Sequence, residues 1–439
     1  MADAAAPSQS DPRPGPTPGL RTHRRVGPFR TLGWAAYLAC SWTWCIGMFL
    51  PILLVRDFGL WGFVVFAIPN CLGAAAMGWV LTRKQSRDIA LAHRPMVALF
   101  SAITIAFHYF FLVWLWDAKL GGVEYSGFSE TTFFKYAGHW VAIITLTLAA
   151  AGFLLYRKRG QRDKQLLVCV VVALILTPVL LFVFAGRSDL ASVDSRSFDL
   201  TDAQRIDLIF LAFPVAFGFL LCPYLDATFL RARRWTNRAS GRTAFTLGFL
   251  GIFPIAIIFT VVYMPMLGRM WWNDGLLGAP GSPSSELGGA LLLYIGIQTL
   301  VTVILHFHSL VRALSHPAHA LLVCFGGIGV GIIASTPDFL GDKSELGYRL
   351  FLSAYGLLFP AYVYLCMIPT ADGHAGPTRR KAFTWLAACA LAAPFFWLGF
   401  IEFEEVYLLP GMAIVLASRL LLPGGPIPKL RRAEPDPAN

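Results

Sequence analysis

Charged residues are scarce in this sequence. Asp, Glu, Lys and Arg together make up 14% of its 439 residues, whereas 56% of the residues are apolar. This balance does not suit a soluble globular protein, and it is typical of a protein with many membrane-spanning helices.

Motifs for several kinds of chemistry are absent. The eight cysteines form no C-x-x-C pair and all lie in apolar runs, so we interpret them as packing residues. The lack of a G-x-x-x-x-G-K-[ST] loop disfavours nucleotide-driven transport. The first 30 residues hold no apolar core before a small-residue cleavage site, so we expect residues 1–30 to be a disordered cytoplasmic tail and not a signal peptide.

Long apolar runs dominate the rest of the chain. Because about 20 apolar residues are needed to cross a bilayer, they predict an all-α polytopic membrane protein with about 12 transmembrane helices. The expected spans are residues 31–55, 58–82, 95–117, 135–156, 165–186, 206–230, 243–267, 287–311, 317–336, 346–369, 382–401 and 403–423.

The positions of the basic residues test this division of the chain into spans and loops. Most of the 36 Lys and Arg residues fall in alternate loops, and the acidic residues favour the other loops. Because basic residues collect on the cytoplasmic side, this alternation places both termini in the cytoplasm. The net charge of +11 is then an orientation signal that requires no nucleic-acid partner. We expect a multi-pass protein of the plasma or inner membrane with the lipid bilayer as partner, and the sequence leaves the oligomeric state open.

Two of the expected spans are interrupted. Pro214, Gly218 and Pro223 interrupt the sixth span, and Gly47 and Pro51 interrupt the first. Proline breaks the backbone ladder of a helix, and backbone freed in this way is tolerated in a bilayer only inside protein or beside a wet cavity. The interruptions therefore predict a binding site, although kinked helices that only pack are also common in membranes.

The order of the spans predicts an internal symmetry. Residues 31–186 hold five spans and residues 205–369 hold five more, which enter from the opposite side because five is odd. Two additional helices follow in residues 382–423, and residues 424–439 form a cytoplasmic tail. Broken helices at matching places in two inverted repeats indicate a transport site near the middle of the membrane.

Two stretches carry a resemblance to a known family. SWTWCIGMFLPILLVRDFGLWGF (41–63) resembles the first core helix of the sodium:solute symporters, within the amino acid, polyamine and organocation transporter group that has the LeuT fold. CPYLDATFLRARRWTNRASGRTAFTLGF (222–249) is similar to the end of that family's sixth helix. The resemblance implies a LeuT-like 5+5 inverted repeat and alternating access around helices one and six.

The resemblance also bears on coupling ions. The family's eighth helix offers adjacent hydroxyls to sodium, whereas here Thr302 is followed by Val303 and the nearest partner is Thr299. Those threonines are the candidate ion-coupling residues, although threonines in membrane helices often bond their own backbone. The alternative is proton coupling through His108 or Asp226.

The candidate site residues come from four spans. His108 is notable because a histidine at membrane depth is costly without a partner, although an ordinary interhelical hydrogen bond would also satisfy it. Asp226 and Arg231 are expected to form a gate or an anchoring ion pair. The candidate substrate-binding residues are Trp44, Gly47, Met48, His108, Phe213, Phe217 and Gly218.

Three functions remain open on the sequence. The first is a secondary active transporter for a small polar or amphipathic solute, with no catalytic residue, no metal and no cofactor beyond a possible coupling Na⁺ or H⁺. The second is a transporter-like sensor or scaffold without flux. The third is a membrane enzyme with a metal bound by a histidine cluster, which is less favoured because the chain holds a single such cluster: His306, His308, His316 and His319.

Overall fold

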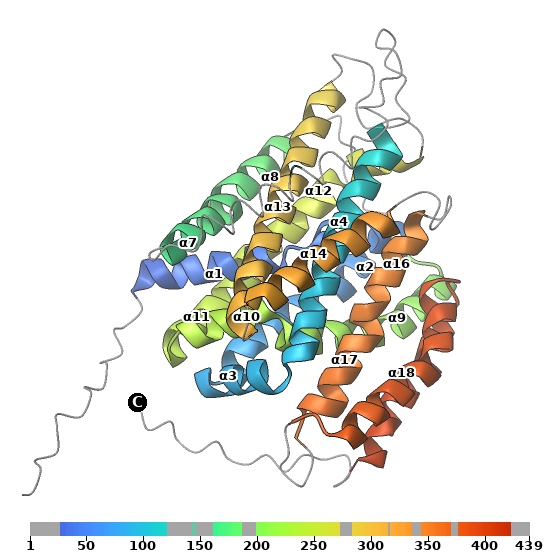
Figure 1. Ribbon diagram of the computed structural model, residues 1–439. Coiled ribbons are helices and arrows are strands. Elements are labelled where there is room, and N and C mark those ends of the chain that lie inside the picture. The colour runs from blue at the N-terminus through green and yellow to red at the C-terminus, as the bar shows by residue number, and fades with distance from the viewer. Residues whose placement is uncertain are drawn as a thin grey trace, which may run out of the picture.

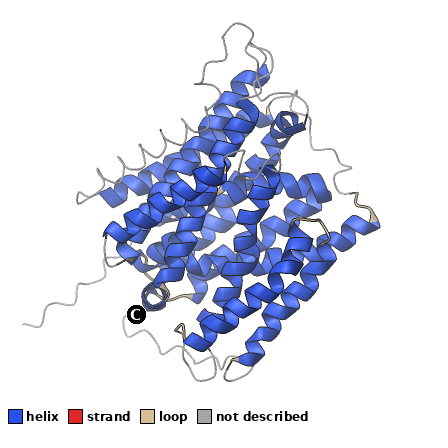
Figure 2. Cartoon of the chain, turned by 45° about the vertical axis from the view of Figure 1, so that its right-hand side comes forward, coloured by secondary structure: helices blue, strands red, loops and turns tan. Residues whose placement is uncertain are grey.

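The computed structural model describes residues 27–120, 144, 161–186, 199–272, 283–314, 317–335, 344–369 and 376–422. Helices are the regular elements of this part of the chain, and it contains no strand (Figures 1 and 2). The first half comprises α1 (Pro28–Trp42), α2 (Cys45–Val80), α3 (Arg83–Ala92), α4 (Arg94–Leu120), α7 (Gln161–Val171), η1 (Val172–Leu176), α8 (Thr177–Ala185), α9 (Asp202–Leu221), η3 (Cys222–Leu225) and α10 (Ala227–Trp235).

The second half continues in the same way. Its elements are α11 (Arg238–Leu247), η4 (Gly248–Ile252), α12 (Phe253–Trp272), α13 (Pro283–Ala313), α14 (Pro317–Ala334), α16 (Ser344–Ser353), η5 (Ala354–Leu358), α17 (Phe359–Tyr362), η6 (Val363–Met367), α18 (Arg379–Phe400), η7 (Glu405–Tyr407), α19 (Leu408–Ala417) and η8 (Ser418–Leu421).

The helical, membrane-embedded class is confirmed. Within the described residues, eight helices are long and apolar enough to cross a membrane, and Ala318–Ala334 is a shorter apolar helix. The predicted fourth span, 135–156, lies outside the described residues apart from Ile144, as do residues 1–26 of the predicted N-terminal tail and the whole predicted C-terminal tail, 424–439. The count of twelve, the type of membrane and the cytoplasmic placement of the termini stay predictions.

Helix α2 contains a turn that divides it into two legs. Phe58 and Gly59 have non-helical backbone angles, and Gly59 lies in the left-handed region with a φ of 57°. Glycine adopts this conformation without the steric cost of a Cβ atom. The first leg of α2 is therefore the end of the predicted first span, and the second leg is the predicted second span.

The first span is broken, but the predicted position of the break is wrong. Helix α1 ends at Trp42, and Thr43 and Trp44 are non-helical before α2 begins. Gly47 and Pro51 both lie inside α2. Pro51 cannot donate to the carbonyl oxygen of Gly47 one turn earlier, and the Thr260 hydroxyl of α12 donates to that oxygen instead at 2.9 Å.

The sixth span is also broken at another place than Gly218, which lies inside α9. Helix α9 continues through Pro214 to Leu221, and a 3₁₀ turn with Pro223 in its first turn follows. Asp226 is extended and its side chain caps α10. Proline suits the first turn of a helix, and aspartate suits the N-cap position, so the α-helix is interrupted over residues 222–226, which include the predicted Pro223.

Small residues bring several helices close together. Helix α14 packs along α4 (Figure 1). A Cβ atom added to Gly327 or Gly331 of α14 would lie 2.6 or 2.2 Å from the carbonyl oxygen of Ala102 or Ala106 of α4. Glycines at such an interface allow close backbone contact between membrane helices.

Contacts between helix ends agree with the predicted arrangement of loops. On the predicted cytoplasmic side, Arg30 pairs with Asp163 at 3.1 Å and Arg233 donates to the carbonyl of Leu81 at 2.7 Å. On the predicted outer side, Gln204 donates to the carbonyl of Asp57 at 3.0 Å. Each contact joins two ends that the loop charges place on one side.

Candidate functional site

A narrow cavity of about 70 Å³ lies between the first leg of α2, α9, the α16–η5 segment and the end of α18. Trp44 and Cys222, which stand at the two helix breaks, both line it. Asp57, Arg349 and Glu405 line it towards the predicted outer side. The cavity therefore connects both breaks with a charged mouth.

The walls between these ends are apolar. Leucine, isoleucine, valine, phenylalanine and proline side chains make up most of the lining. Near the breaks, the Trp44 ring lies 4.3 Å from that of Trp42 and 5.3 Å from that of Tyr355, measured between ring centroids. Such a surface suits an apolar or aromatic ligand body, because apolar walls with a few polar groups are typical of small-molecule sites.

The end of α1 is held by side chains of α13. The amide nitrogen of Gln298 donates to the carbonyl oxygen of Cys40 at 2.7 Å and to that of Thr43 at 3.2 Å. Thr302 donates to the same Cys40 oxygen at 3.2 Å. The Trp44 indole N–H donates to the carbonyl of Ser41. The last carbonyls of α1, which have no partners within the helix, are thus satisfied by the chain itself.

This arrangement bears on the predicted ion ligands. Thr302 does reach the break, but its hydroxyl and the Gln298 amide occupy carbonyls that a cation would need. Thr299 is fully buried, and its hydroxyl has no hydrogen-bond partner among the described residues. Thr302 therefore contacts the first helix break, and the role of the two threonines in ion coupling stays a prediction.

Asp226 and Arg231 do not form the predicted ion pair. One carboxylate oxygen of Asp226 accepts from the backbone N–H and the hydroxyl of Thr228, both at 2.6 Å, and the other oxygen is buried without a hydrogen-bond partner in the described part of the chain. The Arg231 guanidinium donates to Gln165 at 2.9 Å and to Tyr37 at 3.4 Å. The ion pair is absent because Asp226 is the N-cap of α10. Its carboxylate oxygen accepts from the start of that helix, whereas the Arg231 guanidinium donates to Gln165 and Tyr37.

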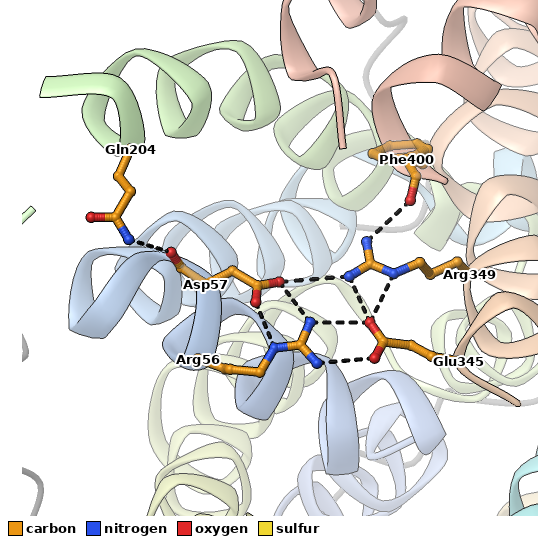
Figure 3. Close-up of polar contacts among 6 residues, drawn as sticks. All are labelled: Arg56, Asp57, Gln204, Glu345, Arg349 and Phe400. Carbon is orange, nitrogen blue, oxygen red and sulfur yellow. Dashed lines mark hydrogen bonds and ion pairs between the residues drawn. The ribbon is translucent and has the colours of Figure 1, made fainter. Parts of the chain in front are cut away.

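Four charged residues form a cluster at the mouth (Figure 3). Arg56 bonds both oxygens of Glu345, at 2.9 and 3.1 Å, and also bonds the neighbouring Asp57. Arg349 bonds Glu345 at 2.7 Å, lies 3.6 Å from Asp57 and donates to the carbonyl of Phe400 at 3.1 Å. The cluster therefore connects the turn of α2 with α16 and the end of α18.

Glu405 stands beside this cluster in the turn between α18 and α19. Its side chain is buried, with 8% exposed. Burial raises the pKa of Glu405 to about 7, the nearby Asp207 and Asp57 carboxylates raise it further, and Arg349 opposes the rise. The mouth thus contains a carboxyl group that changes charge near neutral pH.

The structure brings together only some of the predicted substrate-binding residues. Trp44 and Gly218 line the cavity. Gly47 and Met48 instead offer their carbonyl oxygens to Thr260 and Tyr263 of α12, at 2.9 and 2.6 Å. Neither residue is among those that line this cavity, and their role in substrate binding stays a prediction.

Two predicted phenylalanines of α9 also point away from the cavity. Phe213 is 56% exposed on the outside of the bundle. Phe217 packs against the ring of Tyr364 at 5.9 Å. Helical geometry explains the error, since positions 213 and 217 share a face that Gly218 does not.

His108 lies on α4 one turn after Thr104, whose hydroxyl bonds that of the cavity-lining Tyr355 at 2.9 Å. Its Nδ1 donates to the carbonyl of Thr104 at 2.7 Å, so Nε2 carries the lone pair of the neutral ring. His306 of α13 lies near enough to interact with it electrostatically, bonds Ser101 through Nδ1 and approaches Trp44 with ring centroids 6.0 Å apart. Both Nε2 atoms are buried without a hydrogen-bond partner among the described residues.

The expected histidine cluster is not assembled in the described part of the chain. His308 bonds Gln165 at 2.7 Å, on another face of α13 from His306, and His316 lies outside the described residues. No group of three or more His, Cys, Asp or Glu side chains suited to a metal occurs among the residues that the structure describes.

Sequence reasoning did not assign four important residues to the site. Gln298 is a polar residue within an apolar run, four residues before Thr302, and this spacing was a signal for a shared helix face. Glu345 and Arg349 have the spacing of a helical ion pair. No local sequence pattern marks Tyr355 as a site residue, because its ring contacts that of Trp44 only in the folded protein.

Comparisons with known proteins add no assignment. No protein-family model matches the chain, no curated protein matches it, and no solved structure matches it. The resemblance to sodium:solute symporters stays a prediction.

Proposed function

We propose that the protein is a secondary active transporter that moves a small amphipathic solute by alternating access around its two helix breaks. The observation that carries the proposal is that Trp44 and Cys222, one at each break, line the same cavity. Non-helical backbone within a membrane is tolerated where it is buried in protein or lines a cavity, and broken helices of this kind are typical of transporters.

The order of the helices supports a LeuT-like layout of two inverted five-helix repeats followed by two further helices. In this layout, α1 with the first leg of α2 is the broken first helix, and α9 with α10 is the broken sixth. Helix α13 is then the eighth, and its side chains contact the break of the first.

The lining indicates the chemistry of the solute. The apolar walls and the aromatic floor at Trp44 and Tyr355 fit a hydrocarbon or aromatic body. Asp57, Arg349 and Glu405 at the mouth fit a polar or charged end group. A purely hydrophilic solute would leave the walls without suitable contacts.

Proton coupling fits the site better than sodium coupling. The carbonyls at the end of α1 already accept hydrogen bonds from Gln298 and Thr302. The buried Nε2 atoms of His108 and His306 and one oxygen of Asp226 are unpartnered in the described part of the chain, and each can take up a proton. Intramembrane ionisable groups are common in proton relays.

The experiment is solute binding followed by uptake. The purified full-length chain is screened for thermal stabilisation by amphipathic solutes and then reconstituted in vesicles, where uptake is driven by a proton or a sodium gradient. We expect Trp44→Ala to abolish binding and uptake, whereas Trp61→Ala, at an exposed position of α2, retains both.

The outcomes separate the alternatives. Uptake that follows the pH gradient, and is lost in His306→Gln with binding retained, supports the proposal. Uptake that requires sodium overturns proton coupling only. Binding without uptake under any gradient favours a sensor, and the absence of binding across the panel removes the transporter proposal.

A further inference from the structure

Glu405 is a buried carboxyl group in the lining of the cavity between the helix breaks. It is 8% exposed and lines this cavity at the mouth. Among the described residues, its side chain makes no ion pair and no hydrogen bond to another residue. A buried carboxylate without a partner is costly, and a ligand of opposite charge would relieve that cost.

The two arginines at the mouth are engaged by other carboxylates. Arg56 bonds both oxygens of Glu345 and also bonds Asp57, while Arg349 bonds Glu345 at 2.7 Å and lies 3.6 Å from Asp57. Figure 3 shows both guanidinium groups turned towards these two carboxylates. Arg349 attracts Glu405 electrostatically, but no ion pair joins them in the part of the chain that the structure describes.

Carboxylates outnumber guanidinium groups around Glu405. The charged residues near it are Arg56 and Asp57 of α2, Asp207 of α9, Glu345 and Arg349 of α16, and Glu402 and Glu404 of its own turn. Burial, and after it the Asp207 and Asp57 carboxylates, raise the pKa of Glu405 to about 7 against the attraction of Arg349. The described mouth is therefore negative when Glu405 is ionised, and a bound cation would lower this pKa again.

The turn that carries Glu405 is held in a strained conformation. Phe403 has a φ of 62°, in the left-handed region that is uncommon for a residue with a side chain. The Arg349 guanidinium lies over the Phe403 ring, 4.1 Å from its centroid, and the Glu404 N–H donates to the carbonyl of Leu398 at 3.0 Å. Strained backbone persists where surrounding contacts hold it, and it is common at ligand sites. These contacts fix the turn, and with it Glu405, at the mouth.

On the basis of the proposed function, which places a solute in this cavity, we propose that the solute carries an ammonium group and that Glu405 binds it. The ammonium donates a charge-assisted hydrogen bond to the Glu405 carboxylate, and the apolar walls enclose the body of the solute. A neutral alcohol forms a weaker bond there, and the negative mouth repels a carboxylate. The solute is therefore a small amphipathic amine.

The proton and the amine compete for the Glu405 carboxylate. An alkylammonium group keeps its charge near neutral pH, as a lysine side chain does, whereas Glu405 ionises around pH 7. The affinity for the amine therefore rises as the pH rises through 7, because more of the Glu405 is ionised. The affinity for a neutral alcohol should depend little on pH in this range.

The test compares amines with matched neutral and anionic compounds by thermal stabilisation of the purified full-length protein at pH 5 and at pH 8. One series is butylamine, butanol and butyrate, and the other is phenethylamine, phenethyl alcohol and phenylacetate. At pH 8, we expect the amine of at least one series to bind about tenfold or more tightly than its alcohol. At pH 5 this preference should largely disappear, and the carboxylate should bind no better than the alcohol at either pH.

Two variants assign the preference to one side chain. Glu405→Gln should remove the preference for the amine and its pH dependence, while binding of the alcohol is retained and shows that the variant is folded. The matched control Glu404→Gln removes a carboxylate from an exposed position of the same turn and should keep both. An amine preference that persists in Glu405→Gln, or that Glu404→Gln removes equally, would overturn the site.

The unmodified protein tests the amine class without any variant. Equal binding of amine and alcohol at pH 8, an amine preference that does not change with pH, or the absence of binding by every compound would overturn it. Binding of alcohols or carboxylates that depends on Trp44, with no preference for amines, would overturn the amine class and leave the transporter proposal in place. Amine binding that depends on Glu405 without uptake in vesicles would support the site and remove transport.

Discussion

The amide nitrogen of Gln298 lies 2.7 Å from the carbonyl oxygen of Cys40 and donates a hydrogen bond to it. The same nitrogen also donates to Thr43 at 3.2 Å, so one side chain of α13 satisfies two carbonyls at the end of α1. A neutral amide thus bridges the carbonyl oxygens of Cys40 and Thr43 at the first helix break.

The first prediction concerns this amide. Gln298→Ala should lower the free energy of unfolding by about 1–3 kcal/mol, because it removes a donor from two buried carbonyls. Chemical denaturation measures the change. The control Gln204→Ala removes a bond to the carbonyl of Asp57 and the capping-box bonds from Thr201, all at a partly exposed site, and should cost less than Gln298→Ala.

A related variant tests whether an ion can replace the amide. Gln298→Glu places a carboxylate beside two carbonyl oxygens, which repel it unless it binds a proton or a cation. We expect its melting temperature to rise with added sodium or at lower pH, whereas that of the unmodified protein does not depend on sodium. A sodium-dependent melting temperature in the unmodified protein would contradict the view that Gln298 fills this position.

The mouth cluster gives the third prediction. Arg349→Gln should destabilise the protein by about 1–3 kcal/mol, because its guanidinium joins Glu345, Asp57 and the carbonyl of Phe400 and is only 15% exposed. The matched control is Arg205→Gln, whose pair with Asp202 is largely exposed, at 62% and 94%, and should contribute less than about 0.5 kcal/mol. Equal losses would show that the cluster does not hold α2, α16 and α18 together.

Glu405 makes the free energy of unfolding fall as the pH rises. Its pKa in the folded protein, about 7, lies above its usual value of 4.5, so folding favours the protonated form. The stabilising contribution is complete below about pH 4.5 and is lost as the pH rises through 7, on the order of 2–3 kcal/mol in total. Glu405→Gln should remove this part of the pH dependence, as the difference between melting curves at pH 5 and pH 8 would show. Glu404→Gln, at an exposed position in the same turn, should leave it unchanged.

The general fold could be predicted from the sequence because its signals are local. Apolar runs mark the helices, and the predicted Pro223 lies in the interruption of the sixth span. The position of the first break could not be predicted from Gly47 and Pro51, because distant donors decide which carbonyls remain helical. Thr260, 213 residues after Gly47, replaces the N–H that Pro51 lacks, and so the helix continues there.

The site was predicted less well than the fold. Trp44 and Gly218 line the cavity, although their role in binding stays a prediction. Phe213 and Met48 do not line it, because the face of a helix that meets a cavity depends on the neighbours of that helix. Gln298 was missed because its partner Cys40 lies 258 residues away along the chain, and no local pattern joins the two.

The last prediction uses the close contact between α9 and η5. A Cβ atom added to Gly218 would lie 2.6 Å from the carbonyl oxygen of Tyr355, which is backbone and cannot rotate away. Gly218→Ala should therefore separate α9 from η5 and lower the free energy of unfolding by about 1–3 kcal/mol. Gly296→Ala is the matched control, since it places the same methyl group on membrane helix α13 with nothing within 4 Å, and it should be neutral or stabilise the protein by up to about 1 kcal/mol.

Solute binding separates packing from function at this position. Gly218 also lines the cavity, so movement of α9 away from Tyr355 changes the wall as well as the stability. If the cavity binds the solute, Gly218→Ala should weaken binding at a temperature where the variant is still folded, and Gly296→Ala should not. Retained binding in a destabilised Gly218→Ala variant would place the solute elsewhere, because the wall would have moved without consequence for it.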